Sequence, residues 1–158
     1  MSFSIIAAVG KNRELGKNGG LCFSLSADLK YFKKTTIGHR CLMGYNTFKS
    51  LPHKLPGREN MVVSYEEVTE ADATITDLPE FIKIYENSDE EIFICGGGMV
   101  YQELLPHCKK LYLTEVKAEC PDADTFFPEF DKSLYEKKVI SEEHENDLAF
   151  SFVVYTKK

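Results

Sequence analysis

Short, almost continuous apolar runs recur along this chain, and several of them end in glycine or lead directly into a helical pattern. A strand with apolar residues at successive positions is buried on both faces, as in a parallel sheet that helices cover on both sides. Residues 4–9, which Gly10 ends, are therefore expected to form a strand inside the core. Further strands are expected at residues 40–44, 60–64, 73–76, 91–95 and 110–116.

Helical patterns separate these strands. A first helix is expected to start at a cap formed by Ser24 or Ser26 and to run to about residue 36. Proline favours the start of a helix and stops its interior, which sets the bounds of the others. They are expected at residues 45–51, 78–85 and 99–105.

Two alternating stretches close the chain, at residues 135–140 and 149–155, and residues 145–147 join them into an antiparallel hairpin. Residues 11–24 and 122–130 are expected to be loops. The order of elements predicts an α/β fold with a mostly parallel central sheet, helices on both faces and a C-terminal antiparallel hairpin.

Composition narrows the class of protein. With 158 residues, 43% of them hydrophobic, residues 1–158 are expected to form one domain with a substantial core. A net charge of −6 argues against binding to nucleic acid or to anionic membranes. Five cysteines without a C-x-x-C pair, and no signal-like start, fit a reducing cytoplasm. The four histidines have no metal-ligand spacing, so no metal is expected.

Asp28 is the residue that most strongly indicates a functional site. On a helix, Leu25, Leu29 and Phe32 form an apolar arc of about 60°, and Asp28 falls roughly 40° beyond its edge. Lysines already supply a solvated face, so Asp28 is expected to point toward the core or a cavity. A carboxylate beside the glycine-rich residues 15–20 suggests binding or acid–base chemistry. The alternative is a first-turn Asp that contacts the free N–H groups of its own helix.

Two strand-to-helix turns carry glycine, at Gly44 and at residues 96–98. Such a turn lets a phosphate approach the backbone, although an ordinary turn is the commoner meaning and the G-x-G-x-x-G spacing is absent.

Arg58 follows a Pro-Gly turn and is either surface charge or a clamp for a carboxylate. Thr114 lies within the expected strand 110–116 and is either a β-former or a site residue.

These segments, in their order and spacing, resemble dihydrofolate reductase along essentially the whole chain. The residues that carry the resemblance are Ile6-Ala7-Ala8, Leu15-Gly16, Leu25, Ala27-Asp28-Leu29, Phe32-Lys33, Met43-Gly44, Thr47-Phe48, Leu55-Pro56-Gly57-Arg58, Gly96-Gly97-Gly98, Val100-Tyr101, Leu111-Tyr112-Leu113-Thr114 and Phe127-Pro128. The resemblance implies NADPH-dependent hydride transfer to C6 of 7,8-dihydrofolate with a proton delivered to N5, a monomer, and antifolates as inhibitors.

The resemblance also implies a role for each site residue. Asp28 would hold the pterin edge and promote protonation, Thr114 would support that edge, and Arg58 would bind the glutamyl α-carboxylate. The implied catalytic residues are Asp28, Leu21, Phe23 and Thr114. The implied substrate site is Ile6, Ala7, Asp28, Phe32, Leu51, Leu55, Arg58, Cys95 and Thr114. The implied cofactor site is Ala8, Leu15, Gly16, Gly44, Tyr45, Asn46, Thr47, Val63, Ser64, Tyr65, Cys95, Gly96, Gly97, Gly98, Met99, Val100 and Tyr101, with Gly96-Gly97 as the family's cis peptide.

Four features depart from the family pattern. Phe23 stands where the family usually has Trp, and Cys22 where it has Pro. The positions after Gly44 and after Gly98, where the family usually places basic residues for the 2′-phosphate of NADPH, hold Tyr45-Asn46 and Met99. The competing interpretations are a related pyrimidine reductase of riboflavin synthesis, which should lack the set formed by Asp28, Phe32 and Arg58, and a non-catalytic nucleotide-binding module.

Overall fold

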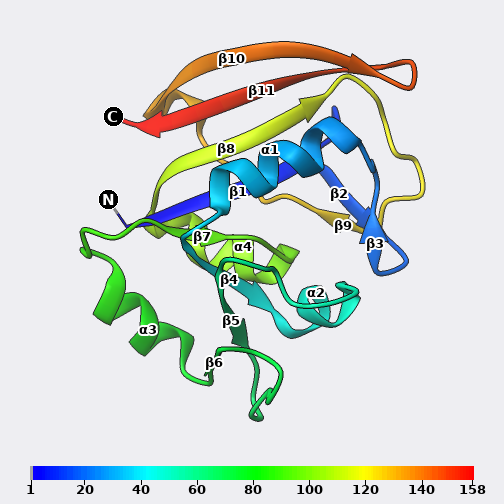
Figure 1. The fold of residues 1–158 in the computed structure, drawn as a ribbon. Coiled ribbons are helices and arrows are strands. Elements are labelled where there is room, and N and C mark those ends of the chain that lie inside the picture. The colour runs from blue at the N-terminus through cyan, green and yellow to red at the C-terminus, as the bar shows by residue number, and fades with distance from the viewer. Residues whose placement is uncertain (1) are drawn as a thin grey trace.

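The computed structural model describes residues 2–158. An 8-stranded sheet forms its centre (Figure 1). The strands of this sheet are β1 (Phe3–Val9), β4 (Arg40–Gly44), β5 (Glu59–Val63), β6 (Ala73–Ile75), β7 (Ile92–Ile94), β8 (Cys108–Val116), β10 (Tyr135–Glu145) and β11 (Leu148–Lys157). The helices are α1 (Ser26–Thr36), α2 (Tyr45–Ser50), α3 (Leu78–Tyr85) and α4 (Gly98–Leu104), with 3-10 turns η1 (Leu105–His107) and η2 (Lys132–Leu134).

The strand order is β10-β11-β8-β1-β7-β4-β5-β6. β1 lies between β7 and β8 and pairs with both in parallel, so that Ile5 lies opposite Ile94 on one side and Leu111 on the other. β4, β5 and β6 continue the parallel pairing, whereas β11 joins β8 antiparallel and β10 joins β11. The predicted mostly parallel sheet with a C-terminal antiparallel hairpin is therefore confirmed.

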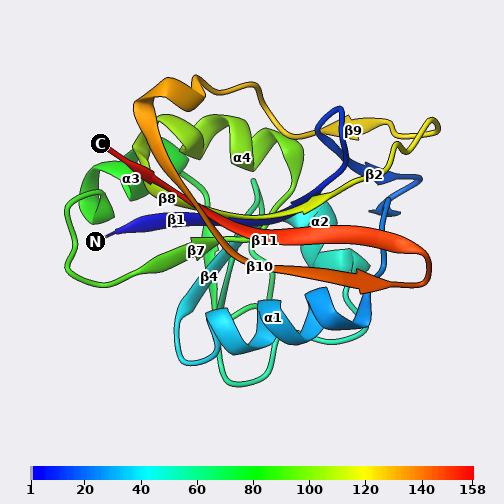
Figure 2. The ribbon, with the colours of Figure 1, turned by 90° about the horizontal axis from the view of Figure 1, so that it is seen from above.

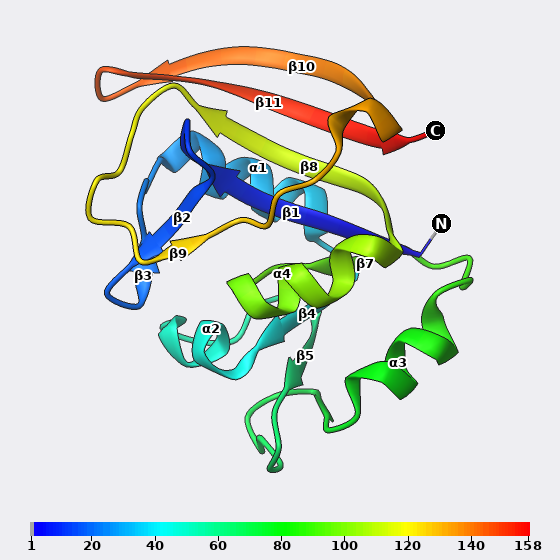
Figure 3. The ribbon, with the colours of Figure 1, turned by 180° about the vertical axis from the view of Figure 1, so that it is seen from behind.

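Helices cover both faces of the sheet. Figure 2 shows α1 on one side and α3 and α4 on the other, and Figure 3 shows α4 in front of the strands with α3 beside them. Phe48 of α2 packs with Ile6 and Val62 on the α1 face. Phe81 and Leu104 pack into the larger core cluster on the opposite face. Within residues 2–158, none of the helices combines the length and the apolar character that crossing a membrane requires.

The local sequence explains α3 better than it explains α1. α3 has the predicted bounds, because Asp77 accepts a hydrogen bond from Glu80 N at 3.0 Å and Pro79 occupies the first turn. For α1 the predicted serine cap is wrong: the cap residue is Leu25, and the first N–H groups donate to the carboxylate of Glu145 instead. The predicted apolar arc is also incomplete, since the side chain of Leu29 is 53% exposed.

The expectation that residues 11–24 and 122–130 are plain loops is wrong in part. Short strands there form a second sheet in the order β3-β2-β9, with β2 at Glu14–Lys17, β3 at Gly20–Leu21 and β9 at Thr125–Phe126. A Cβ atom at Gly16 would lie 2.4 Å from the carbonyl oxygen of Gly20, so glycine is required at this close crossing. Asp124 N donates to Gly16 O at 2.9 Å and strengthens the link.

Glu14 anchors this second sheet. Its carboxylate is buried and accepts from Asn12 N and Cys120 N, each at 2.7 Å and each on a different oxygen. Burial by itself would raise the pKa of Glu14, but the backbone hydrogen bonds outweigh it, so the pKa lies below its ordinary value. The charged form of Glu14 therefore joins residues 10–17 to the segment that follows β8.

We expect Glu14→Gln to lower the free energy of unfolding by about 1–3 kcal/mol, because a glutamine has only one acceptor oxygen and leaves one of the two N–H groups without its partner. Since the pKa of Glu14 is lowered on folding, its stabilising effect is present above its ordinary pKa and is lost as the pH falls through the folded value. The difference between the two proteins should thus shrink in acid. Urea unfolding at neutral and acidic pH measures it.

Glu129→Gln is the matched control, because the side chain of Glu129 is 85% exposed. Its effect should stay within about 0.5 kcal/mol. Equal stability of Glu14→Gln and wild type at neutral pH would contradict the anchoring role.

Candidate active site

The carboxyl ends of the parallel strands meet at one edge of the sheet, which is where ligands bind in open α/β sheets. Ala8 of β1 lies opposite Thr114 of β8. On the other side of β1, β4 ends at Gly44, and β7 leads into the glycine turn at residues 96–98. The structure therefore brings the predicted substrate and cofactor residues of different strands to the same edge.

Asp28 and Thr114 form the polar centre of this edge. The hydroxyl of Thr114 donates to Asp28 Oδ1 at 2.6 Å, and Thr114 itself is only 2% exposed. Burial raises the pKa of Asp28, and the Thr114 hydrogen bond only partly offsets that effect. The pKa of Tyr31 is raised as well, mainly by burial and partly by the nearby Asp28 charge. The site therefore holds a carboxyl group that takes up a proton more readily than an exposed aspartate.

Apolar side chains continue from this centre toward Arg58. Ile6 is buried, and Phe32, Leu51 and Leu55 are half-buried against the same cluster, whereas Ala7 is half-buried against the larger core cluster. Arg58 is held in place, because its Nη1 donates to Thr36 Oγ1 at 3.1 Å and its Nε to Pro56 O at 3.0 Å. Its guanidinium carbon lies 5.7 Å from the centroid of the Phe32 ring. The arrangement fits a flat apolar group that ends in a carboxylate.

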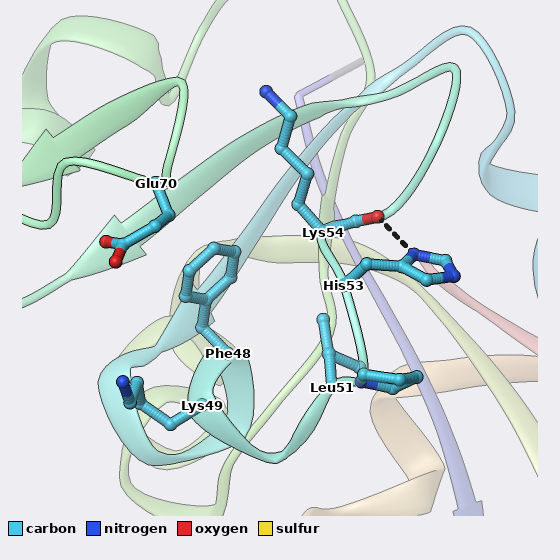
Figure 4. Close-up of a pocket in the computed structure, with 7 residues that line it drawn as sticks. Phe48, Lys49, Leu51, His53, Lys54 and Glu70 are labelled. Atoms are coloured by element: carbon cyan, nitrogen blue, oxygen red, sulfur yellow. Dashed lines mark hydrogen bonds between the residues drawn. The ribbon is translucent and has the colours of Figure 1, made fainter.

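Two hollows lie beside this region. One, of about 330 Å³, is lined by Phe48, Lys49, Leu51, Pro52, His53, Lys54 and Glu70 (Figure 4). The other, of about 470 Å³, is lined by Lys54, Leu55, Pro56, Gly57, Arg58, Glu59 and Asp72. Neither of the two includes Asp28 or the glycine turn. We place the chemistry at Asp28, because a half-buried carboxyl group with a single buried partner is the stronger chemical signal.

The glycine turn packs closely against α2 and α4. The Gly96–Gly97 peptide is cis, as the resemblance implies, and Gly96 has a φ of 128°. Gly44 N donates to Gly96 O at 2.8 Å. A Cβ atom at Gly97 would lie 3.1 Å from Thr47 Oγ1, so a side chain would fill the space in which the bare backbone now faces the Thr47 hydroxyl. An open strip of backbone of this kind fits the pyrophosphate of a dinucleotide.

The remaining predicted cofactor residues surround this turn unevenly. Tyr45, Asn46, Tyr65 and Met99 are exposed, with Tyr65 at 99%. Ala8, Thr47, Val63, Ser64, Cys95, Gly97 and Gly98 are half-buried. Leu15, Gly16, Gly96, Val100 and Tyr101 are buried. The buried members shape the site through packing, whereas the exposed ones are free to contact a ligand.

Two further predicted catalytic residues differ in their exposure. Leu21 of β3 is 58% exposed, whereas Phe23 is buried against Leu25, Phe150 and neighbouring apolar side chains. The structure thus places Phe23 in the core beneath α1, and Leu21 at the surface of the second sheet. Their catalytic roles stay predictions from the resemblance.

Sequence reasoning missed two contacts that shape the site. The hydroxyl of Tyr101, a predicted cofactor residue, donates to Ile6 O at 2.7 Å and joins α4 to β1. Glu145, at the end of β10, binds the first turn of α1 close to Asp28. No local pattern marks Glu145, because its partners lie more than a hundred residues away in the sequence. Among residues 2–158, no cluster of three or more His, Cys, Asp or Glu side chains is placed to hold a metal ion.

Comparisons with known proteins agree with this geometry. The family model described as dihydrofolate reductase matches residues 2–157. Dihydrofolate reductase of Bacillus subtilis is 36% identical over 162 residues, which cover 98% of this chain and 94% of that protein. Dihydrofolate reductase of Haemophilus influenzae is 35% identical over 136 residues, with 86% and 84% covered.

A solved structure extends the likeness to three dimensions. Dihydrofolate reductase from Enterococcus faecalis, complexed with NADP(H) and RAB-propyl, superimposes with a TM-score of 0.88 at 27% identity. The superposition covers 99% of this chain and 96% of the other. The family model, the two relatives and this structure cover nearly the whole fold, and the chain belongs to the dihydrofolate reductase family.

Proposed function

We propose that this protein reduces 7,8-dihydrofolate to 5,6,7,8-tetrahydrofolate with NADPH, and that Asp28 binds the pterin edge and promotes protonation of N5. The observation that carries the proposal is the half-buried Asp28 carboxylate, held by the Thr114 hydroxyl at the carboxyl edge of the sheet. The presence of Phe32 and Arg58 beside it argues against the pyrimidine reductase of riboflavin synthesis. A module that only binds a nucleotide would not need the carboxylate.

Asp28 orients the substrate through its acceptor oxygens. A carboxylate that faces the 2-amino and N3 groups of a pterin accepts two parallel hydrogen bonds, which define the plane and the direction of the ring. The Thr114 hydroxyl fixes Oδ1, so the carboxylate does not turn back toward the helix. Because burial raises the pKa of Asp28, its buried charge gains most from a ring that supplies donors or carries a proton, and this favours protonation of the bound pterin.

The residues of the glycine turn fit NADPH, which supplies the hydride when it is bound. Gly44, Thr47, Gly96 and Gly97 would hold its pyrophosphate, since they present bare backbone and one hydroxyl. Ile6, Phe32 and Leu55 exclude water from the ring of the substrate. This apolar surrounding also strengthens the hydrogen bonds to Asp28.

Antifolates that carry a diamino edge should bind at Asp28 in the same way, because they present two donors to the carboxylate.

From the sequence we infer that the protein is a single-domain monomer and that it works in the cytoplasm. The structure's five free cysteines support a reducing compartment.

Asp28→Asn should reduce turnover sharply at neutral pH and leave NADPH binding intact, because the amide cannot accept both hydrogen bonds and has no charge to favour a protonated ring. Part of the activity should return in acid, where the substrate arrives protonated. Steady-state kinetics from pH 5 to pH 9 measures both effects. Near-normal turnover at neutral pH would exclude this role for Asp28.

The same variant should be at least as stable as the wild type. Since the pKa of Asp28 is raised on folding, any stabilising effect is present below its ordinary pKa and is lost as the pH rises through the folded value. At neutral pH the charged carboxylate therefore opposes folding. Thermal unfolding at neutral pH checks this, and it separates lost chemistry from a lost fold.

Arg58 should act on substrate binding and not on chemistry. Arg58→Leu should raise KM for dihydrofolate by an amount equivalent to about 1.5–3 kcal/mol, since a charge-assisted hydrogen bond to the glutamyl carboxylate is lost. The control is a pterin substrate without the glutamyl tail, for which the loss should be much smaller. Equal losses on both substrates would contradict the clamp.

Cofactor choice should be less strict than is usual for the family. The positions that usually carry cations hold Tyr45, Asn46 and Met99, and each charged hydrogen bond to a phosphate is worth roughly 1.5–3 kcal/mol. Some attraction remains, because the Lys49 ammonium lies 5.9 Å from the centroid of the Tyr45 ring and the hydroxyl of Ser64 can donate. NADPH should therefore stay the preferred cofactor by a reduced margin.

The ratio of kcat/KM for NADPH to that for NADH measures this margin. It should lie below about 10³, equivalent to roughly 4 kcal/mol. Tyr45→Arg should widen it, and Lys49→Met should narrow it. A preference above about 10³ in the unmodified protein would contradict the prediction and would require another cation at the 2′-phosphate.

A further inference from the structure

The first turn of α1 is capped by an acidic residue from the far end of the chain. Glu145 Oε2 accepts from Ser26 N at 2.7 Å, and Glu145 Oε1 accepts from Ala27 N at 3.0 Å and from the Ser26 hydroxyl at 3.0 Å. Asp28 is the next residue of the same turn. Two carboxylates therefore approach one helix start, but only one of them binds its N–H groups.

An acidic residue in the first turn of a helix ordinarily serves that turn. The N–H groups there lack partners within the helix, and a nearby Asp or Glu side chain accepts from them and gains from the helix dipole. Those contacts lower the pKa of the carboxyl group. The pKa of Asp28 is instead raised, because its carboxylate is buried and is directed to Thr114 on β8 and not to the N–H groups of α1. Glu145 already occupies the N–H groups of Ser26 and Ala27.

The β10–β11 hairpin holds Glu145 at this place. Glu145 pairs with Leu148, and the turn between them consists of Asn146 and Asp147, both with positive φ, a conformation that these two residue types tolerate well. β11 pairs with β8, which carries Thr114. The strand that supplies the partner of Asp28 and the hairpin that supplies the cap of its helix thus belong to one hydrogen-bonded unit.

We propose that Glu145 is a positioning residue for the reaction: it takes the N–H groups at the start of α1, so that the Asp28 carboxylate stays directed at Thr114 and at the substrate. This proposal rests on the proposed role of Asp28. Without Glu145, Asp28 turns toward the free N–H groups of its own helix, its pKa falls, and less of it is protonated at neutral pH.

Other charged and titratable groups also surround these two carboxylates. The phenols of Tyr31 and Tyr101 interact with the Asp28 charge, and Lys30 of α1 interacts with Glu145. The hydrogen bonds from Ala27 and Ser26 hold the pKa of Glu145 below its ordinary value. Glu145 is therefore charged throughout the pH range in which the enzyme would be assayed. A change of slope near neutral pH in a plot of kcat against pH does not come from titration of Glu145.

The direct test is the pKa of Asp28 in the full-length protein without ligand, followed by the carbon-13 chemical shift of its carboxyl group. Glu145→Ala should lower this pKa by about half a unit, the size of a helix-terminus interaction. Glu145→Gln keeps one acceptor oxygen and should lower it less. Glu143→Ala is the matched control, because it removes the same charge from an exposed position of β10 and should leave the pKa unchanged.

Kinetics gives a second readout. In Glu145→Ala the basic limb of the kcat profile should move to lower pH, and kcat above neutral pH should fall about threefold, with the Kd of NADPH unchanged. An Asp28 pKa in Glu145→Ala equal to that of the wild type, or lower in Glu143→Ala than in Glu145→Ala, would overturn the proposal.

Two variants separate this proposal from the proposed function. If Glu145→Ala does not fold, Glu145→Gln is compared with Glu143→Gln: a lower Asp28 pKa in the former supports positioning, and equal values refute it. Normal turnover of Asp28→Asn would instead refute the proposed function, whereas the chemical shift of Asp28 would still report on Glu145. The two failures are therefore distinguishable.

Discussion

Parallel pairing on both sides of β1 is the constraint on which the rest of this structure depends. Antiparallel neighbours can be joined by a tight turn, but parallel neighbours need a long crossover. Ile5 therefore lies between Ile94 and Leu111, which both follow α1, α2 and α3 in the sequence. The crossovers place helices on both faces and bring the carboxyl ends of the strands to one edge. Asp28, on the first crossover helix, thereby reaches Thr114 on β8.

Local signals were sufficient for the elements of the main sheet. Continuous apolar runs predicted its strands to within about two residues at most ends, because burial on both faces excludes polar residues. α3 was predicted with its bounds, since its cap Asp77 and Pro79 lie next to it in the sequence. The inward direction of Asp28 was also predictable, because the lysines of α1 already supplied a solvated side. What these features share is that their cause lies within a few residues.

The features that were missed have distant causes. β2, β3 and β9 are only two to four residues long and exist because of their partners across the second sheet. The cap of α1 comes from Glu145 and not from a serine beside the helix. Leu29 has the spacing of a core residue and yet is exposed, because helical periodicity shows which face a residue lies on and not whether another element covers that residue.

The hairpin contact to α1 gives the order of protein synthesis a functional meaning. β10 and β11 leave the ribosome after every other strand of the main sheet. The other strands can therefore pair while the first N–H groups of α1 still lack the Glu145 carboxylate. A nascent chain of that length holds its Asp28 helix but lacks the cap that Glu145 provides. The Asp28 carboxylate therefore gains the support of this cap only at the end of synthesis, once the hairpin has left the exit tunnel and paired with β8.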